Sequence, residues 1–98
     1  SARDMARLVA ALLDGSAPGT GALEPRADFQ RGLRIGLAWM TSADRAGHEL
    51  TWHNGMTGGF ASIVTLDRAA GRGAVVLSAS SRIVDDVGRA LLSPETAR

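Results

Sequence analysis

The stretch FASIVTLDRAAGRGAVVLSA, residues 60–79, decides the fold of this chain. Residues 60–66 and 73–79 are rich in β-branched and other aliphatic side chains, which favour strands. The segment between them, residues 67–72, is polar and contains a glycine, which is typical of a turn. The two apolar segments are therefore predicted to be neighbouring antiparallel strands.

Two further extended segments precede this pair. In residues 33–42, apolar side chains such as Ile35 and Leu37 alternate with the residues of a second face, and this period of two predicts one continuous strand. Residues 43–47 supply a turn, and residues 48–55 are extended again. The two segments are predicted to form a hairpin.

Helices are predicted on either side of the strands. Residues 1–14 carry apolar side chains at i, i+3, i+4 and i+7, the spacing of one helix face, and Gly15 follows as a stop. The predicted fold class is α+β, an antiparallel sheet of three to four strands with N- and C-terminal helices in one domain of 98 residues. The predicted division is a helix in 1–14, a linker in 15–32, antiparallel strands in 33–80 and a helix in 82–92.

The composition excludes several kinds of function. The chain has 11 Lys and Arg residues against 10 Asp and Glu residues, a balance too even for the strong positive field of a nucleic-acid binder. All 11 positive side chains are Arg, and without Lys or Cys the chain has no Schiff-base amine, P-loop lysine, thiolate nucleophile or disulfide. No apolar run approaches the ~20 residues of a membrane-spanning helix. We expect no nucleic-acid partner and no membrane span.

The densest group of unusual residues is WHNGMTGGF, residues 52–60. The glycines Gly55, Gly58 and Gly59 leave the backbone free to approach a ligand and to direct N–H groups at an anion. His53 stands beside them, at the expected end of a strand, where an imidazole can donate a hydrogen bond or move a proton. From these residues alone, the alternative is a glycine-rich hairpin with an incidental histidine.

No metal site and no cofactor are expected. His48 and His53, the two histidines, are five positions apart, which places them on opposite faces of a strand. Asp85 and Asp86 are adjacent, so on a helix they diverge by about 100° and do not form a catalytic pair. Their expected role is to favour the positive end of the helix dipole.

The segment HNGMTGGFAS, residues 53–62, resembles the third motif, written Lys-Thr-Gly or His-x-Gly, of the serine β-lactamase and penicillin-binding-protein superfamily. It is most similar to the branch of class C β-lactamases, D-alanyl-D-alanine carboxypeptidases and esterases. The flanking residues resemble the family in the same order: 2–8 its preceding helix, 35–39 its Tyr-Gly-Leu-Gly-Trp strand, 73–80 its following strand and 82–92 its closing helix. The resemblance implies part of a β-lactamase-like domain.

The resemblance also implies a role for each position of the motif. His53 would line the cleft and tune the proton network, and the backbone N–H of Met56 would be an oxyanion-hole donor for acyl transfer. These two are the expected catalytic residues. The expected substrate-binding residues are Asn54, which stands where Thr is frequent, Gly55, which lets substrate lie against the strand, and Thr57.

The family's other two motifs are absent from this chain. The nucleophile lies in Ser-x-x-Lys and the second motif is Tyr-x-Asn or Ser-x-Asn, but the chain has neither Lys nor Tyr, and Asn54 is its only Asn. We therefore expect the C-terminal part of a β-lactamase-like serine hydrolase, inactive alone. Its expected partners are the N-terminal part or a second copy, with a β-lactam, D-amino-acid peptide or ester as the substrate of the whole enzyme. The family resemblance implies a periplasmic, cell-envelope or secreted location.

Two functions of other classes are compatible with the same residues. The chain is then either a non-catalytic module that binds an anion or a peptide at the glycine-rich hairpin, or a structural or assembly domain. An upstream Ser-x-x-Lys followed by Tyr-x-Asn would favour the hydrolase over both.

Overall fold

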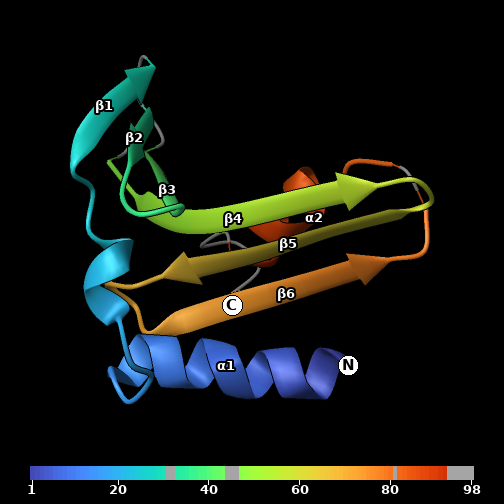
Figure 1. The fold of residues 1–98 in the computed structure, drawn as a ribbon, viewed down its shortest axis with the longest axis horizontal. Helices are drawn as coiled ribbons and strands as arrows, with labels where there is room; N and C mark the ends of the chain where they lie inside the picture. Colours follow the sequence, from blue (N-terminus) through green and yellow to red (C-terminus); the bar gives the residue numbers. More distant parts are fainter. Residues whose placement is uncertain (31–32, 44–46, 81, 93–98) are drawn as a thin grey trace.

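The computed structural model describes residues 1–30, 33–43, 47–80 and 82–92, in which two α-helices, one 3-10 helix and six strands are found (Figure 1). In chain order the elements are α1 (Ala2–Asp14), the 3-10 helix η1 (Thr20–Leu23), β1 (Ala27–Gln30), β2 (Leu33–Ile35), β3 (Met40–Ala43), β4 (Glu49–Thr57), β5 (Phe60–Asp67), β6 (Arg72–Ser78) and α2 (Asp85–Leu91). The strands form one sheet in the order β1-β2-β3-β4-β5-β6, and every neighbouring pair is antiparallel.

The α+β class is confirmed, although the described residues form six strands where the sequence predicts three to four. The single strand predicted for residues 33–42 is wrong, because β2 and β3 are two strands joined by a tight turn. Gly36 N–H donates to the C=O of Trp39 at 2.7 Å within this turn, and Leu37 N–H donates to the C=O of Ala22 at 3.0 Å. The second bond joins the turn to a distant segment of the chain, and the alternation of apolar and polar residues along one strand cannot reveal such a contact.

The linker predicted for residues 15–32 is also corrected. Its described part contains η1 and β1, and β1 adds a strand beside β2. Leu23 of η1 is buried in one cluster with Val9 and Leu66. The segment is therefore part of the core, because its one large aliphatic side chain finds a place there.

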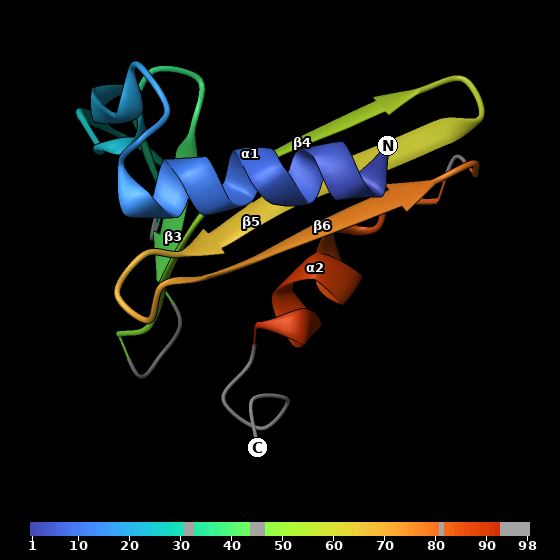
Figure 2. The same cartoon turned by 90° about the horizontal axis from the view of Figure 1, so that it is seen from below.

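Each helix lies on its own face of the sheet (Figure 2). Side chains at even positions of β5 face α1, where Leu66 packs with Val9. Side chains at odd positions face α2, where Ile63 packs with Val84 just before the helix. Because side chains alternate between the two faces along β5, the strand contributes to two hydrophobic clusters, one on each face.

The ends of the helices follow local signals to different degrees. In α1, Ser1 Oγ accepts a hydrogen bond from Asp4 N–H, and Gly15 ends the helix with a φ of 81°. In contrast, α2 is shorter than the predicted 82–92 and begins only at Asp85, so the apolar spacing overran the true start.

Glycines allow both helices to approach the sheet closely. A Cβ on Gly73 of β6 would lie 2.2 Å from Cγ1 of Val9 on α1. A Cβ on Gly88 of α2 would lie 2.8 Å from Cγ2 of Ile63 on β5. Carbon atoms in contact are about 3.5–4.0 Å apart, so both positions require the absence of a side chain.

The β4–β5 hairpin carries the glycine-rich segment. The sequence predicts that extended structure ends near residue 55, but β4 continues to Thr57, and Gly58 and Gly59 alone form the turn. Gly59 has a φ of 81°, which favours glycine. The strand therefore continues two residues past its expected end, and the tip of the hairpin extends past the N-terminus of α1 (Figure 2).

Candidate functional site

The motif lies on the second half of β4, at an open edge of the sheet. The last pair between β3 and β4 is Met40↔Trp52. Beyond it, residues 53–57 pair with β5 on one side, and no strand of the described residues pairs with them on the other (Figure 1). All five predicted site residues are in this half-paired segment.

The hydrogen-bond ladder determines which backbone groups point to this edge. Thr57 and Phe60 flank a two-residue turn and therefore exchange both of their backbone hydrogen bonds. Hydrogen-bonded and non-hydrogen-bonded pairs alternate, so Met56, opposite Ala61, makes no ladder bond to β5. The N–H and C=O of Met56 point to the open edge, and those of Asn54 do the same.

The side chains of the motif divide between the two faces of the sheet. His53 and Gly55 lie on the α1 face, and Asn54 and Met56 lie on the α2 face. Asn54 Nδ2 donates to Asp85 Oδ2 at 2.7 Å, which ties β4 to the first turn of α2. A small hollow of about 160 Å³ lies beside these residues on the α2 face.

His53 is exposed and has one aromatic neighbour among the described residues. Its ring centroid lies 6.2 Å from that of Trp39, and the two planes make an angle of 66°. Val64 stands opposite His53 on β5. The imidazole therefore has aromatic support on the side where β3 has ended.

An open apolar depression of about 520 Å³ adjoins the motif at the tip of the hairpin. Phe60 is 62% exposed and Leu77 is 49% exposed, although both side chains are large and apolar. The depression is lined by Gly55, Met56, Thr57, Phe60, Ala61, Ser62, Leu77, Ser78 and Ala79. It offers a concave apolar surface next to the outward-pointing backbone groups.

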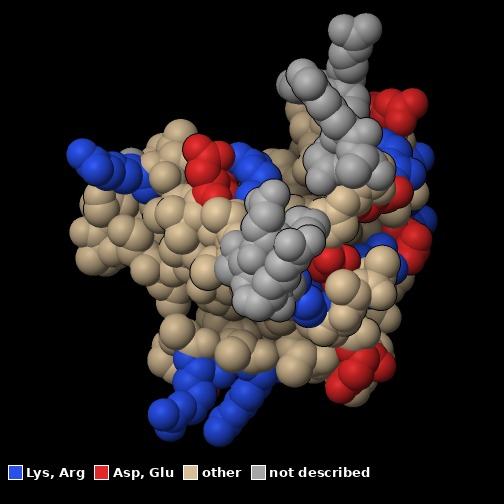
Figure 3. All heavy atoms as spheres, turned by 180° about the vertical axis from the view of Figure 1, so that it is seen from behind, with Lys and Arg blue, Asp and Glu red and all other residues tan. Residues whose placement is uncertain are grey.

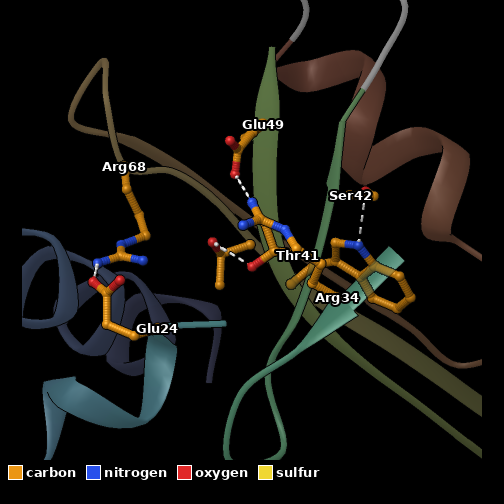
Figure 4. Close-up of polar contacts among 8 residues, drawn as sticks. Glu24, Arg34, Thr41, Ser42, Glu49 and Arg68 are labelled. Carbon is orange, nitrogen blue, oxygen red and sulfur yellow. Dashed lines mark hydrogen bonds and ion pairs between the residues drawn. The ribbon is translucent and has the colours of Figure 1, made fainter. Parts of the chain in front are cut away.

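Ion pairs gather at the opposite end of the sheet, around a cavity of about 550 Å³ (Figure 4). Arg34 pairs with Glu49, and Arg68 pairs with Glu24. The Arg68 guanidinium, by its hydrogen bond and its charge, holds the pKa of Glu24 below the usual value. On the side of the molecule seen from behind, arginine and acidic side chains are distributed among other residues instead of forming one basic area (Figure 3).

His48 contacts a carboxylate at this same end. Its Nε2 lies 2.6 Å from Oδ2 of Asp67, whose exposed fraction is 4%. Burial alone would raise the pKa of Asp67, but hydrogen bonds with the His48 imidazole and the Ala70 N–H outweigh it and hold the pKa below its ordinary value. The pair joins the start of β4 to the turn between β5 and β6.

The described ranges lack two features. Within them, no group of three or more His, Cys, Asp or Glu side chains is placed to hold a metal ion. Neither described helix has the length and apolar character needed to cross a membrane.

Comparison with known proteins identifies the family of the chain. The family model described as Beta-lactamase matches residues 1–97, nearly the whole chain. The chain therefore belongs to the Beta-lactamase family. No curated protein and no solved structure matches it.

The structure brings the predicted site residues together but leaves their roles as predictions. The sequence did not reveal the partners of two of them, Trp39 beside His53 and Asp85 beside Asn54. Asp85 is 31 positions from Asn54, and no periodicity connects residues so far apart.

Proposed function

We propose that this chain is the C-terminal part of a serine hydrolase of the class C β-lactamase, carboxypeptidase and esterase branch. The substrate class is a β-lactam, a D-amino-acid peptide or an ester, cleaved through an acyl-serine intermediate. The observation that supports the proposal most is the open edge of β4, where the N–H of Met56 points out of the sheet three residues after His53.

The role of the edge is electrostatic. A serine hydroxyl outside these 98 residues adds to the carbonyl carbon of the substrate, and negative charge develops on the carbonyl oxygen. The N–H of Met56 donates a hydrogen bond to that oxygen, and because the strand already fixes the N–H, no reorganisation is needed. His53, on the α1 face, binds and releases protons in the network of the nucleophile.

The proposed partner is the polypeptide that carries Ser-x-x-Lys and Tyr-x-Asn. Its docking surface is the apolar depression beside the motif, where Phe60 and Leu77 are exposed on the same face as His53. Exposed apolar patches of this kind mark interaction surfaces. A second copy of the chain, docked or exchanging an element, is the alternative occupant.

The main test removes one hydrogen-bond donor. In a chain extended upstream to include the nucleophile motif, Met56→Pro deletes the N–H that points out of the sheet, and no hydrogen bond of the ladder to β5 uses that N–H. We expect kcat against a chromogenic ester or β-lactam to fall roughly 10²–10³-fold, the usual effect of losing an oxyanion donor. The matched variant Met56→Ala keeps the N–H and the rate. Equal rates in the two variants would contradict the proposed role.

Two substitutions test the neighbouring positions. His53→Ala should lower kcat by roughly 10²–10⁴-fold if the imidazole moves protons. A Cβ on Gly55 would meet only Ser62 Oγ, at 3.5 Å, so Gly55→Ala keeps the fold and places a methyl group on the face that substrate approaches. The control is Gly21→Ala, since a Cβ there meets nothing within 4 Å.

Turnover by the 98-residue chain alone would refute its proposed incompleteness.

A further inference from the structure

Trp39 lies against the imidazole of His53, and nothing in the proposed function uses this contact. The ring centroids are 6.2 Å apart and the planes meet at 66°, which is an edge-to-face arrangement. We infer that Trp39 is a positioning residue that holds the His53 imidazole in one orientation at the open edge of β4. The inference rests on the proposed function only in assuming that His53 has a catalytic role.

The register of the sheet explains why Trp39 is suited to this role. The last pair of the β3–β4 ladder is Met40↔Trp52, so the next position opposite His53 would be residue 39. Trp39 precedes β3 and belongs to the turn, so its backbone does not extend the ladder. Its side chain supports the imidazole as a cross-strand neighbour does, while the backbone edge from 53 onward stays open for substrate.

The turn that carries Trp39 is fixed by its surroundings. Gly36 N–H donates to the C=O of Trp39 at 2.7 Å, which closes the turn. A Cβ on Gly36 would lie 2.5 Å from the carbonyl oxygens of both Ala22 and Glu24, so the turn is pressed against the η1 segment. Ala38 has a φ of 72°, a conformation that persists in an alanine only where the surrounding structure imposes it. Trp39 therefore projects from a defined backbone.

The indole is anchored on one side and free to contact His53 on the other. It packs against the core cluster that contains Val9 and Leu66, which fixes the indole itself. His53 is exposed, and the next residue on its face of β4 is Gly55, which has no side chain to restrict it. An aromatic pair of this kind biases the population of one rotamer by roughly 2- to 13-fold. The indole thus selects the orientation of a ring that the strand leaves free.

The contact can be tested in the 98-residue chain itself by NMR of the histidine rings. The chain has two histidines, so His48, which pairs with Asp67, is an internal control. In the wild-type chain we expect a nuclear Overhauser effect between the Trp39 and His53 rings and a χ1 coupling of His53 typical of one rotamer. Trp39→Leu should average that coupling and move the His53 ring signals, leaving those of His48 in place. Trp39→Phe should restore a single rotamer.

Each result decides for or against the inference. A folded wild-type chain without the Overhauser effect overturns it, and this measurement needs no variant if Trp39→Leu does not fold. An unchanged His53 coupling in a folded Trp39→Leu chain also overturns it. The proposed function fails separately, if an upstream-extended chain with this ring contact forms no acyl-serine intermediate with an ester or a β-lactam.

Discussion

Gly73→Ala tests how α1 is seated on the sheet. The new Cβ would lie 2.2 Å from Cγ1 of Val9 and 3.3 Å from Cδ2 of Leu66. Val9 is β-branched and only 6% exposed, so it has little freedom to turn away, and α1 must shift by more than an ångström relative to β6. Overpacking of this degree destabilises a core by about 1–3 kcal/mol. A domain of this size is stable by only about 5–15 kcal/mol, so the effect is readily measured.

The assay is urea unfolding followed by the fluorescence of the two tryptophans. With a urea dependence of about 1–3 kcal/mol per molar, the midpoint should fall by roughly 1 M in Gly73→Ala. Gly21→Ala, where a Cβ meets nothing within 4 Å, is the matched control and should leave the midpoint nearly unchanged.

A second substitution should relieve the clash. Val9→Ala alone removes two buried methyl groups and is expected to destabilise the fold by about 2 kcal/mol, at about 0.8 kcal/mol per group plus a cavity. In the double variant with Gly73→Ala, the new methyl group occupies the vacated space, so the combined loss should be clearly smaller than the sum. Additive losses, or a Gly73→Ala chain as stable as Gly21→Ala, would refute the close packing of α1 on β6.

Three further predictions concern single polar groups. Asn54→Ala removes the bond to Asp85 and should destabilise the chain by about 0.5–1.5 kcal/mol in the same assay, through a loosened α2. Thr65→Val should stabilise it by roughly 1–2 kcal/mol, because Thr65 Oγ1 is buried without a hydrogen-bond partner in the described residues. Asp67 has a pKa below its ordinary value of 3.8, so its ionised form stabilises the fold above that pH, and this contribution is lost as the pH falls through the folded-state pKa. Asp67→Asn should therefore be less stable than the wild-type chain at pH 7, and this difference in the free energy of unfolding should become smaller in acid.

Each of these three has a contrary outcome. A loss of stability in Thr65→Val would show that the hydroxyl has a partner. If the difference in stability between Asp67→Asn and the wild-type chain is as large in strong acid as at pH 7, the charge of the carboxylate does not contribute to the stability. If Asn54→Ala leaves the hydrogen exchange of α2 unchanged, the bond between Asn54 and Asp85 does not stabilise the helix.

The sequence predicts those parts of the fold that are decided locally. The spacing of Met5, Val9 and Leu12 suffices for α1, and the apolar runs on either side of residues 67–72 suffice for β5 and β6. The turn at Gly36 was missed because the bond from Leu37 to Ala22 decides it, and alternation continues through the turn regardless. Long-range contacts outweighed a local pattern there.

The location of the candidate site was predictable and its surroundings were not. The motif at residues 53–57 was found by its resemblance to a family motif, although the strand that carries it was expected to end near residue 55. That its edge is open depends on where β3 ends, and this follows from the turn that alternation concealed. The contacts of His53 with Trp39 and of Asn54 with Asp85 depend in turn on that register and on the position of α2.

Backbone N–H groups point alternately outward and toward β5 along the open half of β4. Hydrogen exchange at single amides can therefore report whether a ligand is bound there. The N–H groups of Asn54 and Met56 face outward, whereas those of His53 and Gly55 bond to β5. In the unliganded chain, deuterium should enter the first two quickly and the other two slowly. Any strand-like ligand that settles there would slow every second amide, a period-two footprint that a ligand bound elsewhere on the hairpin would not produce.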